Sequence, residues 1–468
     1  MRRTKIVATI GPATRGAGVV RKLVTQVDVF RINFSHGDRA SHLEEIRTIR
    51  SEARRAGRTV AILQDLPGPK IRVGKVRGGA VDLARGARLK LVSGDIVGDS
   101  AVVSVNYPEL LRSVKKGDYL HLADGVIRLR VEENTAEGVS CAVVAGGTLS
   151  SGKGVNAPGV KMKIEYPTQA DAAHLKLGVQ QGVDYIAASF VRSATDLRKI
   201  RRLIPKDGPL LIAKIEKKEA VANFGEILEE ADGIMVARGD LGIEVPIETV
   251  PVIQKTIIGR CNAAGKPVIV ATQMLVSMVN FPVPSRAEVT DVSTAILDGT
   301  DAVMLSDETT VGKYPIEAVR MLDRIARSTE KSLGMGEGSA SGPESSETGA
   351  AIARAACRLA GYVGAKAIVA PTQTGSTARR VSMFRPRQPI VAMCTESRVA
   401  RQLTLCMGVI PFVSRPAKTM DSLFERADDA AEKMGLAKRG ERIVVTSGTP
   451  GIKGTTNLIK VSVVGSRA

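Results

Sequence analysis

Short apolar runs recur through most of the chain, each bounded by glycine, proline or charged residues. Runs of this length predict buried parallel β-strands, and the stretches between them have helical spacing. Eight such runs lie at Lys5–Ile10, Asp28–Asn33, Thr59–Asp65, Tyr185–Phe190, Leu210–Ile215, Gly233–Ala237, Val268–Ala271 and Ala302–Leu305. Eight alternating units predict an α/β protein built on a closed (β/α)8 TIM barrel. An open doubly wound sheet is the alternative, but charged strand ends spread along the series favour closure.

The alternation breaks between the third and fourth runs. Residues 71–155 are rich in valine and glycine, and segments such as Ala87–Val92 and Val126–Val131 alternate apolar with polar positions. Such alternation predicts a small antiparallel β domain. Because it follows the third strand, we expect a small β-barrel lid over the active face of a barrel formed by residues 1–70 and 156–333.

The end of the chain predicts a third unit. Residues 334–346 are rich in glycine, serine and glutamate, which is typical of a linker. Beyond it, strand-like runs alternate with helical stretches, so residues 347–468 are expected to form a separate α/β domain of regulatory type. The runs lie at Ala367–Ala370, Ile390–Cys394, Val409–Val413, Arg442–Thr446 and Leu458–Val464.

Two neighbouring predicted strands end in charged clusters. Lys214-Ile215-Glu216 closes one, and Arg238-Gly239-Asp240 follows the other. Parallel α/β proteins place their chemistry at the carboxyl ends of strands, so one ammonium and two carboxylates should meet there. Two carboxylates can hold a hard divalent cation while the lysine faces an anionic oxygen. The pattern predicts a metal-dependent reaction on a phosphorylated or carboxylated small molecule; an exposed ion pair is the alternative for Lys214 and Glu216.

Composition narrows these expectations. The 468 residues carry a formal net charge of +19, but aromatic residues make up only 3%, so platforms for stacking bases are scarce and specific nucleic-acid binding is not expected. The five cysteines are scattered and form no Cys-x-x-Cys pair, which argues against a disulfide framework or a zinc site. No apolar run approaches the roughly 20 residues of a membrane helix. We therefore expect a cytoplasmic protein without a membrane partner.

Further polar motifs follow other predicted strands, and together the motifs resemble the pyruvate kinase family in kind and in order. They are Thr9-Ile10-Gly11-Pro12, Arg31-x-Asn33-Phe34-Ser35-His36-Gly37, Lys214-Ile215-Glu216, Arg238-Gly239-Asp240-Leu241-Gly242, Ala271-Thr272-Gln273-Met274 and Ser306-x-Glu308-Thr309. The resemblance covers nearly the whole chain. It implies a glycolytic phosphotransferase with a barrel, a lid and a C-terminal α/β domain, which transfers phosphate from phosphoenolpyruvate to ADP and yields pyruvate and ATP.

The resemblance also implies roles for individual residues. Glu216 and Asp240 would bind Mg²⁺, with Mn²⁺ as a substitute, and Lys214 would neutralise charge on the phosphoryl group and the enolate. Arg31 would bind the phosphate as a fork. Gly239, Asp240, Thr272 and Ser306 would contact the substrate, with Thr272 near the site of enolate protonation. Asn33, His36, Arg72 and Lys153 would contact the nucleotide phosphates, with Arg72 also in a catalytic role.

One departure from the common family pattern concerns potassium. Many members carry glutamate where this chain has Lys70, and a fixed ammonium can replace a mobile monovalent cation. The resemblance therefore implies that K⁺ is not required. Asn33, Ser35, Asp65 and the Leu66 carbonyl could still form a monovalent-cation site, for which Lys70 would be the substitute.

The C-terminal domain contains a loop rich in hydroxyl groups at the start of a helix. Thr372, Thr374, Gly375, Ser376 and Thr377 could form a phosphate-binding nest, and they resemble the family's effector loop. An ordinary helix cap is the alternative. We expect an allosteric effector with one phosphate, or no regulation, and the resemblance implies a homotetramer.

Two other functions remain open from the sequence. The chain could be another barrel enzyme of phosphoenolpyruvate or pyruvate, such as an aldolase, although an aldolase needs no lid carrying Lys153. It could also be a non-enzymatic basic binding protein, for which Lys214 would be dispensable. Gly147–Lys153 nearly matches a P-loop, but Gly154 replaces the required serine or threonine, so this segment is interpreted as the lid hinge.

Overall fold

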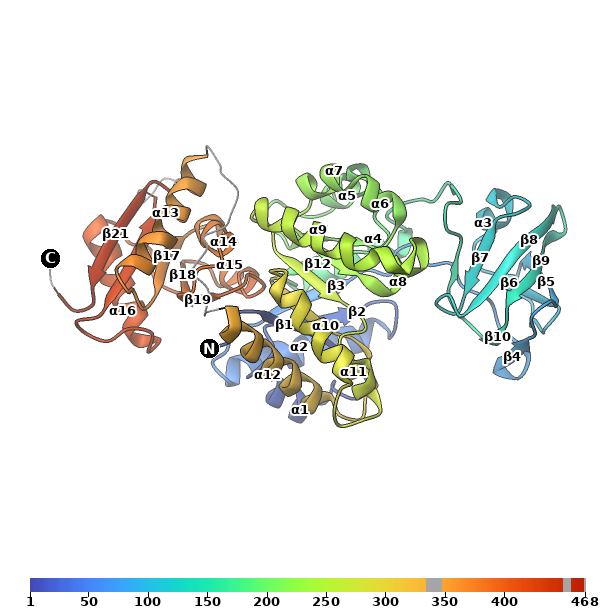
Figure 1. Cartoon of the computed structure of the whole chain (residues 1–468), viewed down its shortest axis with the longest axis horizontal. Coiled ribbons are helices and arrows are strands. Elements are labelled where there is room, and N and C mark those ends of the chain that lie inside the picture. The colour runs from blue at the N-terminus through green and yellow to red at the C-terminus, as the bar shows by residue number, and fades with distance from the viewer. Residues whose placement is uncertain (334–346, 449–455, 467–468) are drawn as a thin grey trace.

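The structure is a computed structural model that describes residues 1–333, 347–448 and 456–466, so the predicted linker 334–346 lies outside the described residues. Eight parallel strands close into a barrel in the order β1-β16-β15-β14-β13-β12-β3-β2 (Figure 1). The predicted strands and their closure are confirmed, and the open sheet is wrong. The strands are β1 (Lys5–Ile10), β2 (Val29–Asn33), β3 (Ala61–Asp65), β12 (Tyr185–Ala188), β13 (Leu210–Ile215), β14 (Gly233–Ala237), β15 (Val268–Ala271) and β16 (Ala302–Leu305).

Helices surround the barrel and bury its outer face. Strand β1 is buried at every position, because side chains on one face fill the barrel and those on the other pack under helices. Reciprocal capping boxes start three of these helices, at Asp38, Thr168 and Ser285. The helices are α1 (Ala17–Leu23), α2 (Arg39–Arg55), α4 (Gln169–Gln180), α5 (Ala194–Arg201), α6 (Lys218–Ala222), α7 (Phe224–Glu230), α8 (Arg238–Glu244), α9 (Val250–Ala263), α10 (Arg286–Leu297), α11 (Asp307–Thr310) and α12 (Pro315–Leu333).

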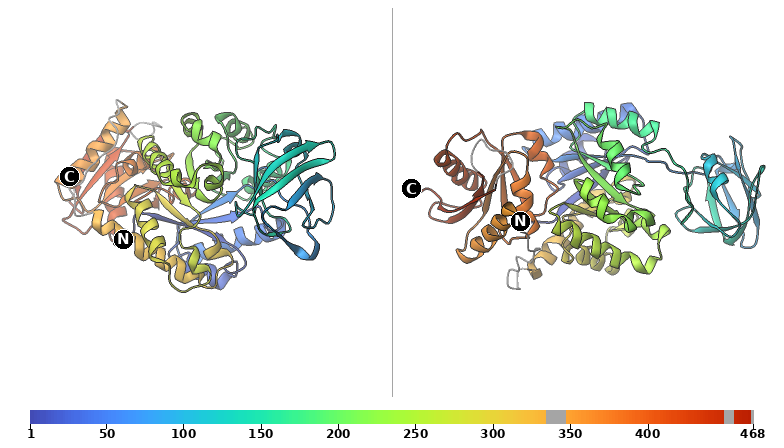
Figure 2. Two further views of the ribbon diagram at one scale, coloured as in Figure 1. Left: turned by 45° about the vertical axis from the view of Figure 1, so that its right-hand side comes forward. Right: turned by 90° about the horizontal axis from the view of Figure 1, so that it is seen from above.

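Residues 71–157, inserted between β3 and α4, form a separate body around their own core. Figures 1 and 2 show this body, the lid, standing away from the barrel and joined to it by two chain crossings. Its strands pair in antiparallel fashion, as expected, except for β5 and β6, which pair in parallel. Its elements are β4 (Ala80–Leu83), β5 (Arg88–Ser93), β6 (Val102–Val105), α3 (Pro108–Ser113), β7 (Tyr119–Leu122), β8 (Ile127–Thr135), β9 (Gly138–Ala145), β10 (Gly147–Ser150) and β11 (Val155–Asn156).

The C-terminal residues form a five-stranded sheet in the order β19-β18-β17-β20-β21, with helices on both faces. The sheet is parallel except for β21. This domain lies at the end of the molecule opposite the lid (Figure 2). Its elements are α13 (Thr348–Tyr362), β17 (Ile368–Thr372), α14 (Ser376–Met383), β18 (Ile390–Cys394), α15 (Ser397–Gln402), β19 (Val409–Val413), α16 (Met420–Lys433), β20 (Arg442–Ser447) and β21 (Leu458–Val463). The predicted boundaries of the three parts, at 70/71, 155/156 and 346/347, stay predictions.

A regular set of aspartates lies at the amino ends of the barrel strands, the face that we call the barrel floor. Asp28, Asp184, Asp232 and Asp301 each directly precede a strand. Each accepts a hydrogen bond from the backbone N–H at the start of another barrel strand, at 2.8 to 3.1 Å. Each also pairs with an arginine. These repeated contacts fix the strand starts relative to one another.

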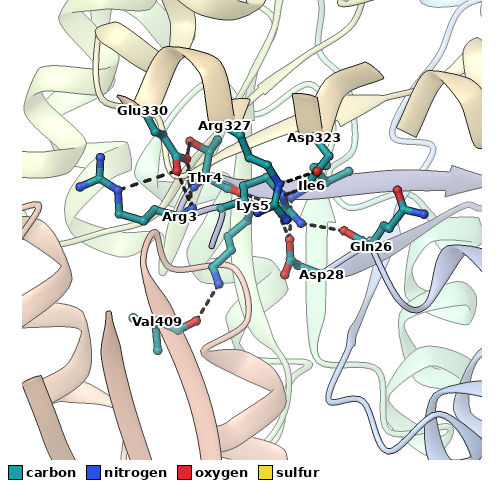
Figure 3. A network of polar contacts seen from close by, with 11 residues as sticks. Arg3, Thr4, Lys5, Ile6, Gln26, Asp28, Asp323, Arg327, Glu330 and Val409 are labelled. Atoms are coloured by element: carbon teal, nitrogen blue, oxygen red, sulfur yellow. Dashed lines mark hydrogen bonds and ion pairs between the residues drawn. The ribbon is translucent and has the colours of Figure 1, made fainter. Parts of the chain in front are cut away.

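The barrel floor also carries the C-terminal domain. Figure 3 shows Lys5 at the start of β1 reaching the Val409 carbonyl of β19, at 2.6 Å. Arg401 of α15 pairs with Asp184, and Arg385 pairs with Asp301, at 2.7 and 2.8 Å. The carboxyl ends of the strands are therefore left open on the other side, where the lid is attached.

Candidate active site

Three strands bring together a basic pair and an acid at the carboxyl end of the barrel. The Arg31 Nε of β2 donates to Asp65 Oδ2 of β3 at 2.7 Å, and its Nη1 donates to Thr9 Oγ1 at 3.0 Å. Lys214 Nζ of β13 lies 3.2 Å from Asp65 Oδ1. All three charged side chains are about nine-tenths or more buried, so their charges act through a weakly screening medium. Asp65 thus holds both cations in fixed positions.

Lys214 is bound from two further directions. Its Nζ donates to Ser189 Oγ at 2.6 Å and lies 2.8 Å from Glu216 Oε1. Burial lowers the pKa of this ammonium, but the charges of Asp65 and Glu216 outweigh that effect and raise the pKa above its usual value. Lys214 is therefore a permanent positive charge in this site, suited to facing an anionic group.

Glu216 is less well compensated than its neighbours. Its Oε2 accepts the Phe190 N–H at 2.7 Å, whereas Oε1 faces Lys214 without an aligned hydrogen bond. Burial and the nearby charge of Asp240 raise the pKa of Glu216, because one ammonium is shared between Asp65 and Glu216. No hydrogen bond or ion pair from the described residues reaches the Asp240 carboxylate.

This imbalance fits a divalent cation. Arg31 and Lys214 supply two positive charges against three carboxylates, those of Asp65, Glu216 and Asp240. Within the described part of the chain, no group of three His, Cys, Asp or Glu side chains forms a ready metal cage. Hard cations such as Mg²⁺ use one or two carboxylates and take their other ligands from water and substrate oxygens. Glu216 and Asp240 have the chemistry of such a half-site.

Thr272 lies beside the start of α8. Its Oγ1 accepts the Gly239 N–H at 2.9 Å, and its backbone has a φ of +69°, an uncommon conformation for a β-branched residue. Arg238 donates to the Thr272 carbonyl at 2.6 Å and pairs with Asp291 of α10, which fixes this turn. Ser306 follows β16 at the same face, where its N–H donates to Glu308 at 2.8 Å. Thr272 and Gly239 are thus brought together next to Asp240.

The predicted nucleotide residues fall into two groups. Asn33 and His36 lie at the end of β2, where Asn33 Oδ1 accepts the Ser35 N–H at 3.1 Å. Arg72 and Lys153 lie in the lid crossings, where Arg72 Nη1 donates to the Gly152 carbonyl and Val73 donates to the Lys153 carbonyl. Burial, followed by the charges of Arg72, Lys70 and Arg31, lowers the pKa of His36. Charges of the lid crossings thus act on His36 of the barrel, whereas no hydrogen bond or ion pair among the described residues joins the Lys153 side chain to the barrel.

The candidate monovalent-cation residues are only partly together. Asp65 uses both carboxylate oxygens on Arg31, Lys214 and Ser189. Leu66 is buried, and its N–H donates to the Ala187 carbonyl. Asn33 and Ser35 are bonded to each other. Lys70 lies close enough to His36 to lower its pKa. The one carboxylate among these candidate residues, Asp65, is therefore already paired with the positively charged side chains of Arg31 and Lys214.

The predicted effector loop does open a helix. Gly375, with a φ of +85°, precedes α14, and its N–H donates to Thr372 Oγ1 at 2.9 Å. Thr374 Oγ1 donates to Ser376 Oγ at 3.2 Å, and the Thr377 and Thr456 hydroxyls lie 3.0 Å apart. The hydroxyl groups are gathered, but they bond to one another and to the backbone.

Sequence reasoning missed three groups that hold the site. Ser189 and the Phe190 N–H bind Lys214 and Glu216, and Thr9 binds Arg31. Ser189 directly follows β12, so a polar residue at a strand end, the signal used elsewhere in the barrel, could have identified it. Phe190 contributes its backbone N–H and has a φ of +57°. The pattern of side chains in the sequence does not predict this backbone conformation.

Comparisons with known proteins cover almost the whole chain. The family model described as "Pyruvate kinase, barrel domain" matches residues 1–319, and "Pyruvate kinase, alpha/beta domain" matches residues 350–462. A pyruvate kinase from Geobacillus stearothermophilus is 45% identical over 99% of this chain and 80% of its own length. One from Thermococcus litoralis is 45% identical over 96% and 95%, and one from Clostridium acetobutylicum 40% over 99% and 100%.

Proposed function

The chain belongs to the pyruvate kinase family, and from that premise we propose how its own residues carry out the family's reaction. The reaction is phosphoryl transfer from phosphoenolpyruvate to ADP, which gives pyruvate and ATP, and the family generally needs Mg²⁺ and usually K⁺. The alternatives of an aldolase-like enzyme and a non-enzymatic binding protein are wrong. The observation that carries the proposal is the convergence of Arg31, Lys214, Glu216 and Asp240 at one barrel mouth.

Arg31 and Lys214 are proposed to bind the phosphoryl group while it is transferred. The guanidinium can present two parallel N–H groups to phosphate oxygens, and the ammonium acts as a point charge on the phosphoryl group and the developing enolate. Both are held by Asp65, so neither needs to be reoriented when charge develops in the transition state. This preorganisation is supported by the burial of all three side chains.

Glu216 and Asp240 are proposed to hold Mg²⁺, or Mn²⁺ in its place. When bound by these two carboxylates, the ion would supply positive charge that neutralises the charge on the substrate. Two observations support this assignment: Oε1 of Glu216 has no aligned hydrogen bond, and no hydrogen bond or ion pair among the described residues reaches the Asp240 carboxylate.

The substrate carboxylate is proposed to bind at the turn that begins α8. The backbone of Gly239 and Asp240, the Thr272 hydroxyl and Ser306 line this place. Thr272 Oγ1 donates to the Ala271 carbonyl at 2.6 Å and accepts from Gly239. This hydroxyl is proposed to serve the protonation of the enolate carbon, directly or through a water molecule.

Asn33, His36, Arg72 and Lys153 are proposed to bind the nucleotide phosphates. The first two lie on the barrel and the other two on the lid crossings, so nucleotide binding would draw the lid and the barrel together. Excluding water in this way protects a reactive phosphoryl group from hydrolysis.

The chain is further proposed to work without potassium. Both carboxylate oxygens of Asp65 are already bound by Arg31, Lys214 or Ser189, and Lys70 supplies a positive charge that acts on His36. The measurement compares initial rates in tetramethylammonium buffer with and without KCl. Stimulation by more than about tenfold would contradict the proposal.

Regulation and assembly are also proposals. The loop Thr372–Thr377 would bind an effector with one phosphate, and the chain would form a homotetramer. Exposed apolar side chains on the barrel surface, at Ile247, Val252, Phe281 and Val283, support self-association. Sedimentation velocity measures the assembly, and a scan of sugar phosphates and AMP in the assay tests the effector.

The experiment that tests the assigned chemistry is a coupled assay of the purified protein with phosphoenolpyruvate, ADP and Mg²⁺. Pyruvate formation that requires all three reactants, and that is lost in Glu216→Gln and Asp240→Asn proteins of wild-type fold, is expected. Wild-type turnover in either variant would remove that residue from the metal site.

A further inference from the structure

A buried ion pair lies directly behind the two carboxylates assigned to the metal. Lys217 Nζ and Glu244 Oε1 are 2.6 Å apart, and their side chains are 16% and 2% exposed. Lys217 is the residue after Glu216, and Glu244 is the last residue of α8, four positions after Asp240. The pair therefore joins the loop that carries one carboxylate to the helix that carries the other.

Lys217 also contacts Phe190, which lies just after strand β12. Its ammonium lies 5.8 Å from the centre of the Phe190 ring, within the range of a cation–π contact. The Phe190 N–H in turn binds Glu216 Oε2 at 2.7 Å. Lys217 thus contacts Phe190, whose N–H binds Glu216, and Glu244 at the end of the helix that carries Asp240.

The carboxylates of Glu216 and Asp240 need contacts that hold their segments in place. Glu216 and Asp240 repel one another, and in the described residues nothing binds the Asp240 carboxylate. Asp240 belongs to a seven-residue helix, and Arg238 is anchored at its start by Asp291. The Lys217–Glu244 pair anchors the other end. Because Glu244 is almost fully buried, removing Lys217 would leave an uncompensated charge and loosen this end of the helix.

We propose that Lys217 and Glu244 are positioning residues that hold Glu216 and Asp240 at the separation a divalent cation needs. The proposal rests on the metal assignment made above for those two carboxylates. A residue outside the metal's own ligands that orients them typically changes metal affinity by about 10- to 100-fold when it is removed.

The test measures Mn²⁺ affinity directly, by electron paramagnetic resonance of the free ion during titration of the intact protein. Lys217→Met and Glu244→Gln keep side-chain volume and remove one charge each. Each is expected to weaken Mn²⁺ binding by about tenfold. The double variant should be no weaker than the weaker single variant, because the two residues act through one contact.

A matched control is available on the same barrel. Lys255 pairs with Asp298 at 3.3 Å, but the Lys255 side chain is 76% exposed. Lys255→Met is expected to leave Mn²⁺ affinity within about twofold of the wild type, since exposed pairs contribute little. Circular dichroism and urea midpoints identify the folded variants, and two independent single substitutions keep the comparison possible if one of them does not fold.

Two outcomes separate the positioning role from the metal site itself. If Glu216→Gln and Asp240→Asn abolish Mn²⁺ binding while folded Lys217→Met and Glu244→Gln bind it as the wild type does, the positioning proposal is overturned and the metal site stands. If Glu216→Gln and Asp240→Asn leave Mn²⁺ binding unchanged, the metal site is wrong, and the positioning proposal fails with it.

Discussion

The floor and the mouth of the barrel place the same kinds of residue at opposite ends of the same strands. At the floor, an arginine and a backbone N–H bind each of four aspartates: Asp28, Asp184, Asp232 and Asp301. Figure 3 shows Asp28 beside Ile6, whose N–H it accepts. At the mouth, Glu216 shares one lysine with Asp65, and the described residues leave Asp240 without a partner. Both faces therefore carry acidic side chains. They differ in how completely these carboxylates are paired with positive charges and hydrogen-bond donors.

This difference separates a structural face from a chemical one. The charges of Arg2 and Lys5 outweigh burial and lower the pKa of Asp28, whereas burial and Asp240 raise the pKa of Glu216. A fully paired carboxylate has nothing left to offer a ligand. A carboxylate that is buried and underpaired is stabilised by an incoming cation, which is why the mouth and not the floor can bind Mg²⁺.

The largest effect is expected at the mouth, from Lys214→Met. Removing the charge that faces the phosphoryl group should lower kcat by about a thousandfold or more, because preorganised electrostatic stabilisation is usually the largest catalytic contribution. The coupled assay measures it, and circular dichroism verifies the fold. Lys255→Met serves as the control, with turnover unchanged. A folded Lys214→Met protein that keeps more than about a tenth of wild-type kcat would contradict the assigned role.

The next effect is expected at the floor, from Asp184→Asn. This carboxylate is fully buried and binds Arg50, Arg401 and the Ile62 N–H. Its loss should reduce the free energy of unfolding by about 3 kcal/mol, because two arginines lose a buried partner. Urea denaturation followed by circular dichroism measures this loss, with kcat/KM nearly unchanged in the folded protein. A strong loss of kcat/KM with an unaltered urea midpoint would mean that floor and mouth are not separate in function.

Much of the fold follows from local patterns. The eight strands could be predicted because each is a short apolar run bounded by glycine, proline or charged residues. The lid could be predicted because its apolar and polar positions alternate with a different period. The bounds were less accurate: the strand predicted at Tyr185–Phe190 ends at Ala188, and the backbone of Phe190 has a φ of +57° that no strand adopts. The aspartates that precede β2, β12, β14 and β16 were visible in the sequence, but their shared role depends on contacts between strands.

The sequence predicts those parts of the site that consist of side chains at the ends of strands. Lys214, Glu216, Asp240 and Thr272 stand at strand ends, where a parallel barrel must bring them to one face. The pairing of Asp65 with Arg31 and Lys214 was not foreseen, because it depends on which strands become neighbours in the closed barrel. The Phe190 N–H and the Lys217–Glu244 pair depend on backbone conformation and burial, which single-residue patterns do not contain.

A smaller effect, of opposite sign on the two faces, is expected from removing one carboxylate charge at each. In metal-free protein near neutral pH, Asp28→Asn should lower the urea midpoint. Glu216→Gln should raise the urea midpoint, with the free energy of unfolding increased by about 0.5 to 2 kcal/mol, as substitutions in functionally strained sites do. Urea denaturation in EDTA measures both variants. Equal signs for the two would remove the distinction between the faces.

The signs follow from proton linkage. The folded-state pKa of Asp28 is lowered, so its ionised form stabilises the fold at neutral pH, and this stability is lost as pH falls through that pKa. The folded-state pKa of Glu216 is raised, so its protonated form is the stabilising one, and this contribution is lost as pH rises through that pKa. Stability of the wild type should therefore fall below about pH 5, less steeply in Asp28→Asn.

The last prediction concerns Cys406, which lies at the floor between the barrel and the C-terminal domain. We expect almost no chemical labelling of its thiol in the native protein. All five cysteines are free and buried, and burial raises the pKa of Cys406 to about 12. A protonated, enclosed thiol reacts slowly, because the thiolate is the nucleophile. A disulfide reagent such as DTNB should therefore modify fewer than one thiol per native chain and all five in urea. Because Asp301 and Arg385 lie beside Cys406, rapid labelling of this residue in native protein would mean that the paired carboxylates of the floor open readily, contrary to the rigidity inferred for that face.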